Sequence, residues 1–253
     1  DTPTIPSVGG DLDGAVELID PRANELIDPS ARLIRLTGGG VWAEGPVWVP
    51  AENALKYSAV RADRGMRWSE ASGGEIWRAP NDHSNGQTLD REGRVLHCEH
   101  ANRRVARTEP DGTRAGLVDH YDGARLNSPN DIVVKSDGTI WFTDPPYGIV
   151  LPDEGTPAPQ EQPGCFVFRF DPDSGEPSLA TDAIVHPNGL AFSPDETAVA
   201  LSTEGSLHHC LLQLVKYPVF AEKILRFLII LEQLIQQLQR NARFVFLLPR
   251  HFA

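Results

Sequence analysis

The chain has 253 residues, 40% of them hydrophobic, and a formal net charge of −12. An acidic chain is poorly suited to bind nucleic acid, whose phosphates require basic patches, but it is compatible with a cation site. The 22 glycines and 21 prolines follow no short period, which indicates short strands joined by turns rather than a collagen-like chain.

Three segments differ in character along the chain. Residues 1–32 mix Pro, Gly and Asp with short apolar runs, and we expect an N-terminal arm there. Residues 33–205 alternate apolar runs with Asp-Gly and Glu-Gly turns and show no helical periodicity, so we predict an all-β domain. The strands expected in this domain include 41–49, 55–60, 75–78, 94–99, 132–135, 139–143, 165–170 and 189–192.

A short phrase that begins with Glu or Asn recurs in the all-β segment. It starts at Glu44, Asn85, Asn130 and Asn188, at intervals of 41, 45 and 58 residues. Intervals near 40–50 residues with several short strands each are typical of propeller blades. A β-sandwich is the rival architecture, but it would not return the same polar residue to the same strand position. The longest interval contains the Pro- and Glu-rich residues 151–164, which we expect to form an inserted surface loop.

The third segment, residues 206–253, changes character. It carries six Lys and Arg against two Glu, and residues 219–238 place apolar side chains at spacings of three and four. This pattern predicts an amphipathic helix, and its Glu and Gln residues disfavour a transmembrane span. The helix could contact a partner, a membrane surface or the edge of the propeller, or the segment could be of foreign origin and not fold with the rest.

Several longer phrases indicate a family. They are Trp42-Ala-Glu-Gly-Pro-Val-Trp48, Cys98-Glu-His100 with Arg103-Arg-Val105, Asn127-Ser-Pro-Asn-Asp131, Trp141-Phe-Thr-Asp-Pro-Pro-Tyr-Gly148 and His186-Pro-Asn-Gly-Leu-Ala-Phe-Ser-Pro-Asp-Glu196. With these phrases, residues 41–202 resemble the gluconolactonase/SMP-30/luciferin-regenerating-enzyme family, and its bacterial gluconolactonases in particular. The resemblance implies a six-bladed β-propeller, here incomplete, with about four recognisable blades and a helical tail.

The resemblance also implies a divalent cation, usually calcium, in the central channel. The family's ligands carry over to Glu44, Asn130 and Asn188. Another family ligand, an Asp from a later blade, has no counterpart, because the only aspartate after Asn188 is Asp195. Calcium is therefore the expected cofactor, with another divalent cation as the alternative.

Three further residues are expected to contact the substrate. Asn85 holds the equivalent place in its own copy of the phrase, and we expect it to line the pocket. Glu99 and His100 end the strand that follows, near the outer part of a blade or the channel rim. A hydrogen-bonded structural role is the alternative for His100.

The function implied by the resemblance is that of a calcium-dependent lactonase acting on sugar lactones such as gluconolactone. A hard cation would polarise the lactone carbonyl while water attacks it. The family's proton acceptor is the missing Asp, so the catalytic residue is unknown, and Glu44 could substitute only if it is not fully engaged as a ligand. The alternatives are a truncated propeller that binds a cation or ligand without turnover, and a related esterase or organophosphate hydrolase.

The cysteines and the N-terminus bear on the cellular compartment. Cys98, Cys165 and Cys210 are too widely spaced for a disulfide framework or a metal clip, so we expect unpaired, packed thiols. The first residues show no signal peptide, but a chain that begins with Asp1 could be a mature form. Periplasmic and cytoplasmic locations both stay open.

Overall fold

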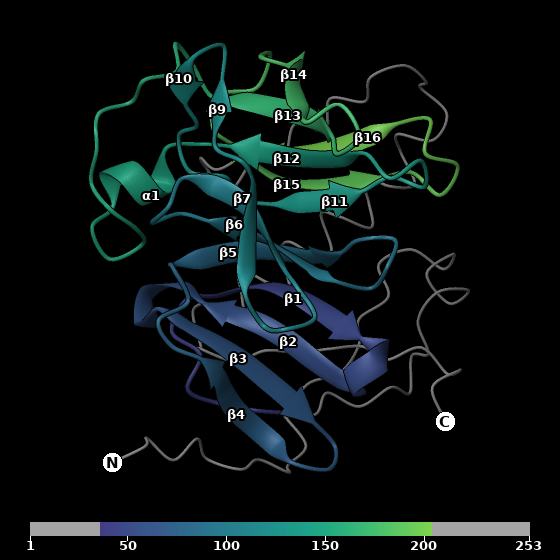
Figure 1. The fold of residues 1–253 in the computed structure, drawn as a ribbon. Coiled ribbons are helices and arrows are strands. Elements are labelled where there is room, and N and C mark those ends of the chain that lie inside the picture. The colour runs from purple at the N-terminus through teal and green to yellow at the C-terminus, as the bar shows by residue number, and fades with distance from the viewer. Residues whose placement is uncertain (1–35, 204–253) are drawn as a thin grey trace, which may run out of the picture.

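The computed structural model describes residues 36–203, which form a fan of antiparallel sheets (Figure 1). Three sheets have four strands each and one has two, and a small hairpin lies between the second and third sheets. We call the sheets blades 1 to 4. Blade 1 comprises β1 (Ala43–Val49), β2 (Ala54–Ala59), β3 (Arg64–Ser69) and β4 (Gly73–Arg78). Blade 2 comprises β5 (Ser84–Leu89), β6 (Val95–Glu99), β7 (Arg104–Thr108) and β8 (Arg114–Val118).

The second half of the fan continues in the same manner. The hairpin is formed by β9 (His120–Tyr121) and β10 (Ala124–Arg125). Blade 3 comprises β11 (Ile132–Val134), β12 (Ile140–Asp144), β13 (Phe166–Asp171) and β14 (Glu176–Thr181), and blade 4 comprises β15 (Pro187–Phe192) and β16 (Val199–Thr203). Short helical turns are η2 (Pro50–Glu52), η3 (Val60–Ala62) and α1 (Tyr147–Val150). The all-β prediction is confirmed, and the described sheets do not close into a ring.

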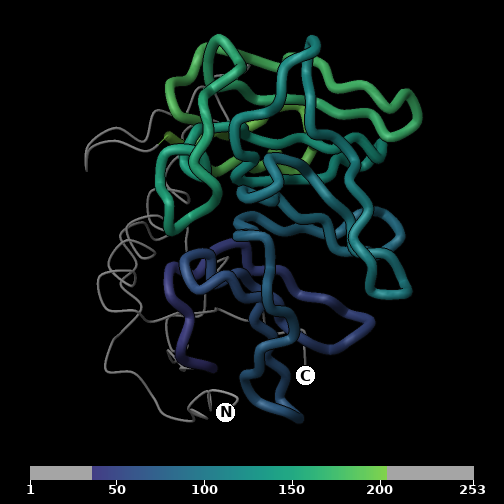
Figure 2. Tube along the Cα trace, turned by 60° about the vertical axis from the view of Figure 1, so that its left-hand side comes forward, coloured from purple at the N-terminus to yellow at the C-terminus, as the bar shows by residue number. Residues whose placement is uncertain are grey.

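Every blade is built from consecutive strands, and its first strand is the innermost one. Strand β5 packs against both β1 and β11, and β11 in turn packs against β15. The sheets follow one another in sequence order from the purple end of the chain to the green end (Figure 2). The four inner strands, which carry the recurring phrase, therefore lie next to one another as a propeller requires.

The blades are held together by different kinds of contact. Blades 2 and 3 share an apolar core that includes Leu96, Phe142 and Phe168, and a second apolar cluster around Leu190 and Leu201 joins blades 3 and 4. Blades 1 and 2 meet through polar side chains instead. Gln87 Nε2 of β5 donates to Ser58 Oγ of β2 at 2.7 Å, and the rings of Trp77 in β4 and His97 in β6 lie 6.3 Å apart. Within blade 2, the arginines that begin β7 and β8 ion-pair with the buried Glu99 of β6.

Residues 151–164 form a mostly exposed surface loop, as predicted, but two of its polar side chains are buried against other parts of the fan. Glu154 is only 4% exposed and its Oε1 lies 2.7 Å from Arg61 Nη2 of blade 1. Gln162, also 4% exposed, donates from Nε2 to the carbonyl oxygens of Tyr121 and Ala124 at 3.0 and 2.9 Å. The polar side chains of this segment satisfy groups on other parts of the fan, so it serves as a strap from blade 3 to blade 1. We call it the strap.

Two sequence predictions extend beyond the described residues. The N-terminal arm, residues 1–32, and the amphipathic tail, residues 206–253, both lie entirely outside them. Between residues 36 and 203, no helix is long and apolar enough to cross a bilayer. Cys98 and Cys165 are free thiols, as predicted, and Cys210 lies outside the described part.

Candidate functional site

Each copy of the recurring phrase lies at an irregularity on an inner strand. In blade 3, the amide of Asn130 donates to the carbonyl of Thr143 at 2.8 Å, while the amide of Asp131 donates to the hydroxyl of the same threonine at 3.0 Å. A β-bulge of this kind bends the strand and redirects a side chain. The registers of the other inner strands shift between Glu44 and Val47, between Ser84 and Gln87, and between Pro187 and Leu190.

The residue two positions before the phrase has the same backbone conformation in three of the four copies. Trp42, His83 and His186 have positive φ angles of 53°, 46° and 52°. A positive φ is uncommon outside glycine, and such backbone strain is concentrated at functional sites. Because the bulge and the left-handed residue recur together, the copies share a backbone geometry as well as a sequence.

The glycine that follows the first residue of the phrase lets neighbouring inner strands touch. A Cβ atom at Gly45 would lie 2.3 Å from the carbonyl oxygen of Asn85, and one at Gly86 would lie 2.5 Å from that of Asn130. The amide of Gly86 donates to this Asn130 oxygen at 2.7 Å. The absence of a side chain at these two positions therefore brings the phrases of blades 1, 2 and 3 into contact.

Asp131 occupies the position that is glycine in the other three copies. Its Oδ2 accepts the amide of Leu190 in blade 4 at 3.0 Å. Burial raises the pKa of its carboxyl to about 6. Sequence reasoning assigned no role to Asp131, although the change from Glu-Gly and Asn-Gly to Asn-Asp in this one copy was a visible signal.

Asn85 and Asn130 meet directly. The Asn85 side-chain amide donates from Nδ2 to Asn130 Oδ1 at 3.0 Å, and both residues are buried. Glu44 and Asn188 are half-buried and lie on the bulges of β1 and β15, which adjoin β5 and β11. The predicted ligand positions Glu44, Asn130 and Asn188 therefore lie on a set of adjoining bulges, with Asn85 between the first two.

His100 lies beneath the strap, fully buried. Its Nδ1 is 3.0 Å from the carbonyl oxygen of Glu154, so this nitrogen carries the proton and donates. Burial lowers the pKa of the imidazole to about 4, against the opposing effects of the Glu154 carbonyl and the Asn130 side chain. His100 is therefore a neutral imidazole beside Asn130, and the hydrogen-bonded structural role has a defined partner.

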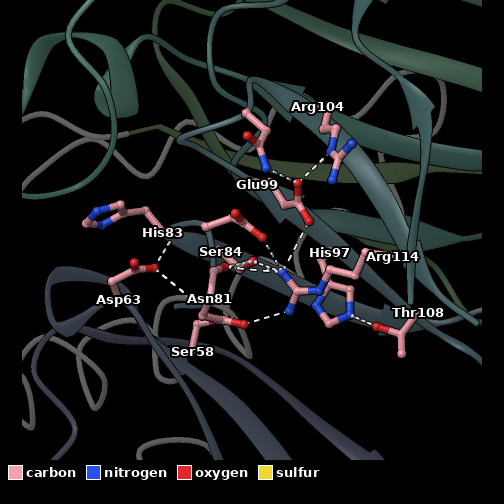
Figure 3. A network of polar contacts seen from close by, with 12 residues as sticks. Ser58, Asp63, Asn81, His83, Ser84, His97, Glu99, Arg104, Thr108 and Arg114 are labelled. Carbon is pink, nitrogen blue, oxygen red and sulfur yellow. Dashed lines mark hydrogen bonds and ion pairs between the residues drawn. The ribbon is translucent and has the colours of Figure 1, made fainter. Parts of the chain in front are cut away.

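Glu99 is held by polar side chains of its own blade (Figure 3). Its Oε2 accepts from Arg104 Nε at 2.6 Å and from Asn102 Nδ2 at 2.8 Å, and its Oε1 accepts from Arg114 Nη1 at 3.1 Å. The residue is 0% exposed. The structure does not bring Glu99 to the group of bulges, and its contact with substrate stays a prediction.

Asp144 is a second buried carboxyl near the candidate site. It ends β12, is 0% exposed, and its Oδ2 accepts the amide of Asn127 at 2.8 Å. Burial raises the pKa of this carboxyl to about 7. Since Asn127 is only three residues before Asn130, Asp144 fixes the loop that leads into the phrase of blade 3.

The donor chemistry of the predicted ligands suits a hard cation. No group of three or more His, Cys, Asp or Glu within residues 36–203 could hold a metal, so a metal here would depend on amide oxygens. Glu44, Asn130 and Asn188 offer one carboxylate and two amide side chains, and calcium takes six to eight oxygen ligands of this kind. These residues fit part of a calcium site, with positions left for water or substrate.

Comparisons with known proteins show the family of the chain. The chain belongs to the SMP-30/gluconolactonase/LRE-like family, whose model matches residues 42–216. It is 32% identical over 210 residues to a gluconolactonase of Zymomonas mobilis, which covers 78% of this chain and 58% of that protein. It is also 36% identical over 95 residues to the lactonohydrolase oryL of Aspergillus oryzae, covering 38% of this chain and 21% of the fungal protein.

A solved structure shows the same fold. The gluconolactonase XC5397 of Xanthomonas campestris superposes with a TM-score of 0.71 at 37% sequence identity, covering 80% of this chain and 67% of that one. The family resemblance inferred from the sequence is thereby confirmed. The chain nevertheless spans only 58% of the length of the Zymomonas relative.

Proposed function

We propose that the protein is a calcium-dependent lactonase that hydrolyses sugar lactones such as gluconolactone. The observation that carries this proposal is the recurrence of an oxygen-bearing side chain at the bulge of each inner strand, at Glu44, Asn85, Asn130 and Asn188. Its relatives support the reaction class, since the proteins from Zymomonas and Xanthomonas are named gluconolactonases.

Each residue of the site has a distinct task in this proposal. Glu44, Asn130 and Asn188 hold the cation through side-chain oxygens. When bound, calcium would polarise the lactone carbonyl and stabilise the negative charge that develops on its oxygen. Asn85 orients the Asn130 amide through their 3.0 Å hydrogen bond, and its remaining amide oxygen can accept a hydrogen bond from a sugar hydroxyl. Glu44 is also the one carboxylate of this set, and it accepts a proton from water only if one of its oxygens is not engaged with the cation.

The proposal is tested by following gluconolactone hydrolysis in a pH-stat before and after chelation. We expect a chelator to abolish hydrolysis, calcium to restore it, and Asn188→Ala to remove it by deleting a ligand. Asn53→Gly is the matched control, because Asn53 is an exposed asparagine in a left-handed turn of blade 1 that glycine tolerates. Hydrolysis that survives chelation, or that is unchanged in Asn188→Ala, would contradict the proposal.

A second candidate is a cation-binding propeller without turnover. It is favoured by the donor set of the described site, in which Glu44 is the one carboxylate beside the amide side chains of Asn130 and Asn188. Calcium binding without lactone hydrolysis would select this candidate. Replacing calcium with magnesium, manganese or zinc, and gluconolactone with an aryl ester or an organophosphate, separates the remaining alternatives of metal and substrate.

A further inference from the structure

The inner strands are joined in two different ways at successive blades. Between blades 2 and 3, the amide of Gly86 donates directly to the carbonyl of Asn130 at 2.7 Å. Between blades 3 and 4, the equivalent amide, that of Asp131, donates at 3.0 Å to the hydroxyl of Thr143, which donates in turn to the carbonyl of Asn188 at 2.6 Å. A side-chain hydroxyl has been inserted where the previous blade has a direct backbone hydrogen bond.

The direction of both hydrogen bonds at this hydroxyl is fixed by chemistry. The Asp131 amide can only donate and the Asn188 carbonyl can only accept, so Thr143 Oγ1 must accept from the former and give its own proton to the latter. Blade 4 repeats the first of these two hydrogen bonds, the one from a backbone amide to a side-chain hydroxyl, because the amide of Gly189 donates to Ser202 Oγ at 2.8 Å. The hydroxyl opposite the bulge is thus a repeated device of these blades.

All of the polar groups of Thr143 form hydrogen bonds to residues of the recurring phrase. Its amide donates to the carbonyl of Asp131 at 3.0 Å and its carbonyl accepts from the amide of Asn130 at 2.8 Å. The residue is 0% exposed, so water does not compete for these bonds. Thr143 therefore connects two predicted cation ligands, Asn130 and Asn188, which are 58 residues apart in the chain.

A second contact acts in parallel. The carboxylate of Asp131 accepts the amide of Leu190 at 3.0 Å, two residues beyond Asn188. Together the Thr143 hydroxyl and the Asp131 carboxylate hold strand β15 on both sides of Gly189. Asn188 is therefore fixed relative to Asn130 by two hydrogen bonds, only one of which passes through a hydroxyl.

We propose that Thr143 is a positioning residue of the cation site, whose hydroxyl sets the separation and orientation of Asn188 relative to Asn130. This inference rests on the proposed function. Thr143 is not itself a ligand, and it acts by fixing the backbone that carries one. Groups that orient ligands in this way typically change metal affinity by about 10- to 100-fold when removed.

The test compares three variants by calorimetric titration of calcium into chelator-treated protein. Thr143→Val keeps the branched shape and removes the hydroxyl, and we expect it to weaken calcium binding about tenfold. Thr143→Ser restores the hydroxyl and should bind within about twofold of the wild type. Thr108→Val is the control, because it loses a threonine hydroxyl hydrogen-bonded to His97 at 2.7 Å between β6 and β7 of blade 2, away from the phrase. Its calcium affinity should stay that of the wild type.

Hydrogen exchange gives a readout that does not need the metal. In Thr143→Val the Asp131 amide loses its acceptor, so we expect faster exchange at Asp131 and in β15, with no change at the Gly86 amide. If exchange is unchanged, the positioning role is wrong. If calcium affinity is unchanged while thermal stability falls as in Thr108→Val, Thr143 is only structural and the inference is also wrong. If exchange accelerates but the wild type binds no calcium, the positioning contact stands and the proposed function fails.

Discussion

The two faces of strand β6 lie in two different kinds of interface between blades, one apolar and one polar. Leu96 and Cys98 point into the apolar core shared with blade 3, whereas His97 lies beside Trp77, Arg78 and Lys56 of blade 1. Glu99 is on the same face of the strand as His97. Side chains of a strand alternate between its faces, so one five-residue strand serves both interfaces. The apolar side requires mainly burial, while the polar side requires a partner for every buried group.

The polar interface does not meet that requirement fully. Three of its buried nitrogen atoms, Trp77 Nε1, His97 Nδ1 and Arg114 Nε, have no hydrogen-bond partner within the described part of the chain. A buried donor without an acceptor destabilises a fold. We therefore expect the apolar interface to supply most of the stability and the polar interface to make stability depend on charge and pH.

The largest effect is expected in the apolar interface. Phe142 is 0% exposed and packs against Phe168, with ring centroids 5.3 Å apart. Phe142→Ala should lower the free energy of unfolding by about 3–5 kcal/mol, because it removes buried apolar surface and leaves a cavity. Urea unfolding measures this loss, and Phe142→Leu should show a smaller one. A loss below about 1 kcal/mol in Phe142→Ala would contradict the expectation that the apolar interface supplies most of the stability, since core substitutions of this kind cost more.

A smaller effect is expected from Glu99→Gln in the polar interface. The substitution keeps the shape of the side chain but leaves Arg104 and Arg114 beside a neutral amide, whose NH2 group cannot accept from either. We expect a loss of about 2–3 kcal/mol in the same urea experiment. A variant as stable as the wild type would show that the charge of Glu99 does not matter to this interface.

The pH dependence of stability should also arise in the polar interface. Burial, and then the positive charges of Arg114, Arg78 and Lys56, lower the pKa of His97 well below its usual 6.5. Below pH 6.5 the unfolded chain takes up a proton that folded His97 does not, so stability falls as pH decreases, by at most about 1.4 kcal/mol per pH unit. His97→Gln removes this contribution.

The measurement is the melting temperature at pH 7 and at pH 5. The wild type should lose more stability over this interval than His97→Gln does. An equal loss in the two proteins would assign the acid sensitivity to other groups. His97 would then give no support to a pH-dependent polar interface.

The smallest effect is expected outside both interfaces. Glu92 has a side chain 63% exposed and pairs with Arg94 at 2.8 Å. An exposed ion pair contributes little, so Glu92→Gln should change the free energy of unfolding by less than about 0.5 kcal/mol. It is the matched control for Glu99→Gln, and an equal loss in both variants would mean that burial does not distinguish them.

The sequence predicted the parts of the site that repeat. Glu44, Asn85, Asn130 and Asn188 could be aligned because each begins the same phrase. The strand register shifts beside three of them, and at the fourth the amides of Asn130 and Asp131 both donate to Thr143. The contacts between repeats could not be predicted in this way. Thr143 meets Asn188 across 45 residues of chain and Arg61 meets Glu154 across 93, and no local pattern encodes pairs so far apart.

The same limit applies to single residues within a correctly predicted loop. Residues 151–164 form the surface loop that their polar, Pro- and Glu-rich composition predicts, but the burial of Glu154 and Gln162 within it depends on bonds to other parts of the fan. Composition indicates which residues can accept burial without a partner, but a polar side chain is buried where the tertiary fold supplies one. His100 and Glu99, adjacent in sequence, likewise differ in role because the strand turns them to different neighbours.

The central claim is that the inner-strand bulges gather the ligands of a calcium ion. It is tested most directly by titrating calcium into chelator-treated wild type and into Glu44→Gln, Asn130→Ala and Asn188→Ala, with binding heat as the signal. The account predicts saturable binding of one ion per chain in the wild type and at least about tenfold weaker binding in each variant. No binding by the wild type, or unchanged affinity in all three variants, would contradict it.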